Sequence, residues 1–182
     1  LDTALDYEKK AQSIIDKLDT NVGKSWIDYR FGLIYEQMGN YEQAHKYFLS
    51  YFQISKNIGE KFSLGKSYYI MGKNYYYKSD YKEAISYLDQ SLKISNEIIA
   101  KGRGQGSDFI YFSIINLEIL IMLTNKKLKN KYNPQRIIKL INSDKNIKFD
   151  TNYNLYQLLE DTSYLETAYN QVQEKAENLE PD

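Results

Sequence analysis

The chain repeats itself with a period of about 40 residues, which constrains its fold more than any other feature. Residues 25–58 and 65–98 align without a gap when Gly32 is placed on Gly72. Identical residues recur at equivalent positions of the two segments: Tyr35 and Tyr75, Tyr41 and Tyr81, Ala44 and Ala84, Ile54 and Ile94, and Ser55 and Ser95. A repeat of this length, made of two helical stretches, indicates helical hairpins that stack into a solenoid.

Composition agrees with a helical protein and excludes several kinds of function. The 182 residues include two prolines and nine glycines, which favours long helices over many short strands. The formal net charge is zero, so no global basic field points to nucleic acid. Cysteine is absent, which excludes disulfides, thiolate catalysis and the usual structural zinc site. Polar residues interrupt the longest apolar run, 109–123, and we therefore expect no membrane span.

Helical periodicity and stop signals predict nine helices and no strand. The first five expected helices cover residues 3–18, 24–38, 41–57, 61–78 and 81–100. They are followed by a long apolar helix that ends at 124, a helix that begins at Pro134, a short helix that is capped by Asp150 or Thr151 and ends at 159, and a last helix that is opened by Asp161 or Thr162 and covers 164–179. Gly39-Asn40 and Ser79-Asp80 are the expected breaks inside the two repeats, and Ser107 or Asp108 is the expected cap of the sixth helix.

We expect a single domain over residues 1–182. Its parts would be an unpaired helix (1–20), a first repeat (24–60), a second repeat (61–100), a degenerate third repeat (107–148) and a degenerate C-terminal hairpin (150–180). Because the chain begins at Leu1, already in a helical pattern, we expect it to be part of a longer protein.

These residues resemble the tetratricopeptide repeat, a hairpin of a helix A and a helix B. The matching positions are the small residues Gly32 and Gly72, the helix A aromatics Tyr35 and Tyr75, the aromatics Tyr41 and Tyr81 that open helix B, the small residues Ala44 and Ala84, and the large residues Phe48 and Leu88. The physics agrees, because small residues let two helices approach and large ones fill the adjacent holes. The resemblance is strong over residues 25–98 and weak over 107–179.

The resemblance implies an all-α, right-handed superhelix of antiparallel hairpins. The repeat is longer than the family's 34 residues, and it is similar to the arrays attached to bacterial signalling proteins. It also implies that helix A lines a concave groove. The groove positions then fall on Trp26, Tyr29, Leu33, Glu36 and Gln37 in the first repeat, and on Lys66, Tyr69, Lys73, Tyr76 and Tyr77 in the second.

From the groove positions we select a partner-binding set: Trp26, Tyr29, Leu33, Lys66, Tyr69, Lys73, Tyr76 and Tyr77. Tyrosine and tryptophan combine large contact area with a polar group and are enriched at binding hot spots. Lys66 and Lys73 are seven residues apart on one helical face, where they could take a carboxylate. Some of the tyrosines are instead expected to fill or cover the core.

No residue set demands catalysis, a cofactor or a metal. The segment Gly59–Ser67 has one residue too many between its glycines for a phosphate loop, and a helix precedes it instead of a strand. Gly102, Gly104 and Gly106 do not fit the G-x-G-x-x-G pattern of a dinucleotide site, because the third glycine of that pattern would fall on Ser107. No strand precedes them either. His45 is the sole histidine, and one histidine without cysteine cannot form an ordinary zinc site.

Charge is uneven along the second half of the chain. Lysine and arginine predominate in residues 126–148, and glutamate and aspartate predominate in residues 160–182. Because the basic segment carries no reader motif, we expect mutual attraction between the two segments, or simple solvation, rather than contact with nucleic acid or lipid.

The function that these observations favour is non-catalytic recognition of a protein or peptide in the groove, as the regulatory or interaction segment of a larger signalling protein. Two alternatives remain open. The first is self-association, in which another copy covers apolar faces of the terminal helices. The second is a sensor of small molecules or peptides, which would need an enclosed pocket with converging polar groups.

Overall fold

The computed structural model describes residues 2–18, 20–101, 108–141 and 147–178, and all regular structure within them is α-helical. The all-α helical-repeat fold is therefore confirmed. The chain divides into two compact units, residues 1–105 and 106–182, each of which is described by itself. That residues 1–182 form a single domain stays a prediction.

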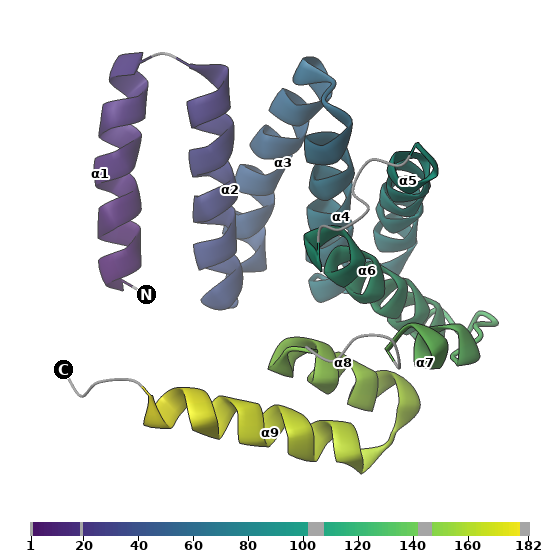
Figure 1. The fold of residues 1–182 in the computed structure, drawn as a ribbon. Helices are drawn as coiled ribbons and strands as arrows, with labels where there is room; N and C mark the ends of the chain where they lie inside the picture. The colour runs from purple at the N-terminus through teal and green to yellow at the C-terminus, as the bar shows by residue number, and fades with distance from the viewer. Residues whose placement is uncertain (1, 19, 102–107, 142–146, 179–182) are drawn as a thin grey trace. The chain divides into compact units, whose positions relative to one another are not determined.

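Unit 1 contains the two repeats and one preceding helix (Figure 1). Its helices are α1 (Asp2–Leu18), α2 (Asn21–Gln37), α3 (Tyr41–Ile58), α4 (Lys61–Tyr77) and α5 (Tyr81–Ala100). Helices α2 and α3 form the first hairpin and α4 and α5 the second, while α3 packs on α4 and α1 on α2. Each helix therefore contacts its neighbours in the chain, as a repeat array requires.

Unit 2 contains α6 (Asp108–Lys127), α7 (Gln135–Ile141), α8 (Phe149–Leu159) and α9 (Thr162–Glu177). Helix α6 contacts α7 and α8, and α8 pairs with α9. The core of this unit includes Ile119, Ile137 and Leu155, none of which is exposed to solvent. The apolar side chains of α6 thus serve as the buried centre of unit 2.

The glycines that the two repeats share lie where their paired helices cross most closely. A Cβ atom on Gly32 would lie 2.3 Å from Cε1 of Phe48, and one on Gly72 would lie 2.7 Å from Cγ of Leu88. Phe48 and Leu88 are completely buried. The prediction that these glycines permit close helix crossings is confirmed.

The turn from helix A to helix B is the same in both repeats. Gly39 and Ser79 have φ values of 72° and 64°, and the next residue, Asn40 or Asp80, caps helix B with its side chain. Lys129, after α6, repeats this left-handed conformation with φ 59°. At all three positions the same backbone bonds recur: the amide of the left-handed residue bonds three residues back, and the next amide bonds five residues back. Unit 2 therefore retains the turn although its repeat signature is weak.

Several boundaries differ from the predicted ones. Helix α2 begins at Asn21 rather than Lys24, because Thr20 caps it by accepting a hydrogen bond from the Gly23 amide at 3.2 Å. Helix α6 continues to Lys127, and α8 begins at Phe149 rather than after Asp150. The predicted cap Ser107, Gly102, Gly104 and Gly106 lie outside the described parts of the chain. So do the side chains of Ile14 and Ile15, which belong to the apolar face expected on the first helix.

Candidate binding face of the repeats

The predicted binding set lies on α2 and α4, the A helices of the two repeats. Trp26 is 53% exposed and Tyr77 is also exposed, whereas the other six residues are half-buried. Three of those six pack against the core cluster of Ala44, Phe48, Tyr51, Ile70 and Met71, namely Tyr29, Leu33 and Tyr69. These side chains thus contribute to the core and present only part of their surface to solvent.

Lys73 already has an anionic partner. Its ammonium donates a hydrogen bond to Oε1 of Glu36 at 2.6 Å, and the Glu36 side chain is almost fully buried. Burial disfavours the charged lysine and is the largest single effect, but the negative charge of Glu36, the neighbouring Tyr69 and Tyr77 and the hydrogen bond to Glu36 together outweigh it and raise the pKa of Lys73. Lys73 therefore joins α4 to α2 and neutralises a buried carboxylate.

Lys66, one helical heptad before Lys73, is in a different electrostatic environment. Its Nζ atom lies 3.9 Å from the centre of the Tyr29 ring, in cation–π contact, and Tyr29 in turn packs on Tyr51 with ring centres 5.4 Å apart. Within the described parts of the chain, no carboxylate lies within ion-pairing distance of Lys66. Burial without a compensating anion lowers the pKa of Lys66. Of the two predicted lysines, Lys66 is the one whose charge is not neutralised by an ion pair.

Trp26 lies on α2, one helical turn before Arg30. The Arg30 guanidinium lies 5.1 Å from the centre of the Trp26 ring, and its Nε donates to the buried carboxylate of Glu8 in α1 at 2.7 Å. The exposed tryptophan is thus held by an arginine that is itself fixed from the preceding helix.

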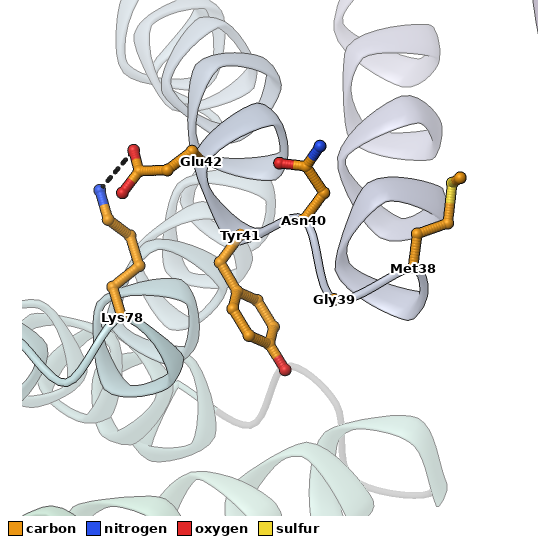
Figure 2. Close-up of a pocket in the computed structure, with 6 residues that line it drawn as sticks. All are labelled: Met38, Gly39, Asn40, Tyr41, Glu42 and Lys78. Atoms are coloured by element: carbon orange, nitrogen blue, oxygen red, sulfur yellow. Dashed lines mark ion pairs between the residues drawn. The ribbon is translucent and has the colours of Figure 1, made fainter.

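A row of tyrosines joins the ends of the A helices to the starts of the B helices. Tyr41 stacks on Tyr77 with ring centres 5.2 Å apart, Tyr77 contacts Tyr76 at 5.8 Å, and Tyr76 contacts Tyr81 at 5.6 Å. Beside this row lies a pocket of about 450 Å³, wide open to solvent (Figure 2). Its lining residues are Met38, Gly39, Asn40, Tyr41, Glu42 and Lys78, and Lys78 forms an ion pair with Glu42 at 3.1 Å. This open site does not enclose a small molecule in the way that a sensor pocket would.

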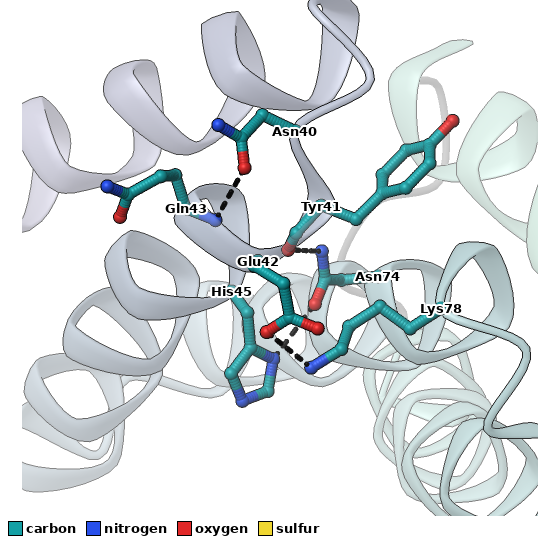
Figure 3. A network of polar contacts seen from close by, with 7 residues as sticks. All are labelled: Asn40, Tyr41, Glu42, Gln43, His45, Asn74 and Lys78. Atoms are coloured by element: carbon teal, nitrogen blue, oxygen red, sulfur yellow. Dashed lines mark hydrogen bonds and ion pairs between the residues drawn. The ribbon is translucent and has the colours of Figure 1, made fainter.

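Asn74 is a buried polar residue that was not identified from the sequence (Figure 3). Its Nδ2 donates to the Tyr41 carbonyl at 3.1 Å, and its Oδ1 accepts a hydrogen bond from Nδ1 of His45 at 2.8 Å. Both partners lie on α3, so one side chain links the second repeat to the first. The sequence signal for this role was that Asn74 aligns with Ile34 of the first repeat, so a polar residue stands where the other repeat has an apolar one. His45 thus has a structural role in the interface between the repeats.

No group of three or more His, Cys, Asp or Glu side chains that could hold a metal ion is found among the described residues. Within the same ranges, every helix is too short or too polar to cross a lipid bilayer.

Comparison with known proteins identifies the repeats. The family model described as tetratricopeptide repeat matches residues 24–97, which correspond to helices α2 to α5. Comparisons with curated proteins and with solved structures find no match. Repeats of this family generally mediate protein–protein interaction as non-catalytic scaffolds. Residues 24–97 therefore match the tetratricopeptide repeat, in agreement with the resemblance of the two aligned repeats to that family.

Proposed function

We propose that the A-helix face of the two repeats binds a segment of another protein that carries a carboxylate. The partner-binding set supplies its contact area, with Trp26 and Tyr77 as the most accessible aromatic side chains. The segment would be extended or helical, and its carboxylate would bind at Lys66. Because the stacked repeats hold these side chains in place before binding, little conformational entropy is lost on association.

The observation that carries the proposal is the contrast between the two lysines. Lys73 is neutralised by Glu36, whereas Lys66 is half-buried against Tyr29 without an ion-pair partner in the described ranges. A partly desolvated cation gains more from an incoming anion than a fully hydrated one does, because the effective dielectric constant around it is lower. We infer from the long repeat that the module serves within a larger signalling protein.

The test uses a peptide that the protein selects from a random peptide library, with affinity measured by titration calorimetry. Lys66→Ala is expected to weaken binding by at least several-fold, and the salt dependence of binding should decrease with it. Lys82→Ala, an exposed lysine on α5, is the matched control and should leave the affinity unchanged.

Lys73→Ala is a less specific variant, because it would leave the buried Glu36 carboxylate unpaired and reduce stability as well as binding. Replacing the peptide's carboxylate by an amide completes a double-mutant cycle with Lys66→Ala. Additive effects of these two changes would contradict the proposed contact. Binding unaffected by Lys66→Ala and by Tyr69→Ala would place the site elsewhere on the protein.

A further inference from the structure

The last helix of unit 2 exposes an apolar stripe. Leu165, Tyr169 and Val172 are spaced four and three residues apart on α9 and are 37%, 62% and 43% exposed. Residues at this spacing share one face of a helix. The face that packs on α8 is a different one, centred near the buried Ala168. The stripe is therefore an additional apolar surface of α9, beside the one that holds the hairpin together.

Acidic residues border this stripe. Glu166 and Glu177 are exposed and lie eleven residues apart, so they form a row next to the stripe on one side of the helix. Glu174 adds a further exposed carboxylate. Lys175, the one cation among α9 residues 162–177, lies with its Nζ atom 4.7 Å from the centre of the Phe149 ring at the start of α8. The exposed surface of α9 thus combines apolar side chains with negative charge.

The opposite chemistry is found where α6 leads into α7. Residues 126–139 contain six lysines and arginines and no acidic residue. Two of these cations are already paired: Lys126 with Glu160 at 2.7 Å, and Arg136 with Glu118 at 2.6 Å. The others are exposed and form no ion pair within the described ranges, and we call them, together with the exposed Tyr132, the basic corner: Lys127, Lys129, Lys131, Lys139 and Tyr132.

The acidic end of α9 cannot neutralise the basic corner of its own unit. Lys126, the residue before the basic corner, pairs with Glu160, which lies two residues before α9, and α9 then runs away from α7 (Figure 1). At a rise of about 1.5 Å per residue, Glu174 and Glu177 lie roughly 20 Å further along the helix. The Debye length at physiological ionic strength is about 8 Å, so attraction over that separation is largely screened. The basic corner and the far end of α9 are therefore left to face solvent or a partner.

We propose that the apolar stripe and acidic border of α9 in one copy of this chain bind the basic corner of a second copy. Tyr132 would contact the stripe formed by Leu165, Tyr169 and Val172, while the surrounding lysines would meet Glu166 and Glu177. The two surfaces are complementary both in charge and in carrying aromatic side chains at their centres. Since the surfaces differ, one copy can use both of them, and either reciprocal pairs or longer assemblies can form.

The experiment is sedimentation analysis of the whole chain over rising protein concentration. The parent is expected to self-associate more strongly at about 0.1 M than at about 1 M salt, because the Debye length falls from about 10 Å to about 3 Å. Two charge-swapped proteins test the contact: Glu166→Lys with Glu177→Lys, and Lys131→Glu with Lys139→Glu. Each alone should associate at least about tenfold more weakly than the parent, because like charges then meet at the interface.

Mixing the two charge-swapped proteins is the decisive measurement. The reversed α9 of one protein then faces the reversed basic corner of the other, and association should return in the mixture. Tyr169→Ser tests the apolar part of the contact without changing any charge. The control pair Lys46→Glu with Lys56→Glu, two exposed lysines on α3, makes the same change of charge elsewhere and should associate as the parent does.

Circular dichroism checks that each protein remains helical. Glu166→Gln with Glu177→Gln replaces the α9 variant if that protein does not fold, and Lys131→Gln with Lys139→Gln replaces the basic-corner variant in the same way. A parent that remains monomeric at every concentration overturns the proposal. So does a mixture that fails to associate, or a control pair that is weakened as much as the swapped proteins. A parent that associates only in the presence of anionic vesicles or RNA also overturns it, because the basic corner would then serve a different partner.

Discussion

Replacing Gly72 with alanine places a methyl group where the helices of the second repeat have no room for it. The new Cβ atom would lie 2.7 Å and 2.8 Å from Cγ and Cδ2 of Leu88, and 3.1 Å from the Leu88 backbone nitrogen. Favourable carbon–carbon contacts begin near 3.5 Å, so α4 and α5 must separate or Leu88 must leave its position. Overpacking of this kind costs roughly 1–3 kcal/mol. Alanine regains about 1 kcal/mol through its higher helix propensity.

We therefore expect Gly72→Ala to reduce the free energy of unfolding by roughly 0–2 kcal/mol, and Gly72→Leu by more, because it adds three further carbons at the same point. Urea denaturation followed by Trp26 fluorescence measures the change, since the sole tryptophan lies in unit 1. Gly65→Ala is the matched control on the same helix. Its Cβ would meet only the Ile94 side chain, at 3.0 Å or more, and the variant should be close to neutral.

A double-mutant cycle identifies the cause of the change. Leu88→Ala alone should cost about 2–5 kcal/mol, because it leaves a cavity in the core. In that background the two closest side-chain atoms are gone, and Gly72→Ala should become neutral or stabilising. An effect of Gly72→Ala that is the same in both backgrounds, or that matches Gly65→Ala, would refute the close-crossing explanation.

Two further predictions concern the ends of helices. Ser79→Gly and Lys129→Gly should each stabilise the protein by about 0.5–1 kcal/mol, because a left-handed φ is strained for any residue with a Cβ atom. Thermal unfolding measures the change, and a loss of stability in either variant would contradict this explanation. At the start of α4, burial opposes the charge of Glu60 more than any other single effect, but the hydrogen bonds from the Phe62 and Ser63 amides at 2.8 Å and 2.6 Å, together with the Ser63 side chain, outweigh it and lower the pKa of Glu60 below the ordinary 4.5. The stabilising effect of the Glu60 carboxylate should therefore be fully present above pH 4.5 and disappear as the pH falls through the lowered pKa. Glu60→Gln should accordingly reduce the loss of stability between neutral and acidic pH. An identical pH dependence of unfolding in parent and variant would count against this role.

The sequence predicts best what depends on neighbouring residues. The breaks at Gly39-Asn40 and Ser79-Asp80 were predictable, because a left-handed residue followed by a capping side chain is a local signal. The close crossings at Gly32 and Gly72 were predictable because the repeat shows the same small residue twice. The start of α8 was harder to predict, because Lys148, the residue before the helix, forms no capping hydrogen bond with its side chain.

Features that depend on contacts between distant residues could not be predicted in the same way. Glu36 and Lys73 were both assigned to the groove, but nothing in the sequence shows that these two residues, 37 positions apart and on different helices, form an ion pair. Lys66 and Lys73 therefore looked equivalent, although one is paired and the other is not. The burial of Asn74 also depends on α3 packing over it, and a polar residue in an otherwise apolar repeat position was the sole indication.

We expect the amide of Asn74 to affect how the repeats come apart. Separating α4 from α3 would break the hydrogen bonds of Asn74 to Tyr41 and His45. In a partly opened interface these polar groups would lack hydrogen-bond partners, which costs free energy. Such half-open states are costly, so the two repeats should open as one cooperative block rather than one after the other. In hydrogen exchange, the backbone amides of α3 and α4 would then share a single protection level, and a protease would meet this block either closed or fully open.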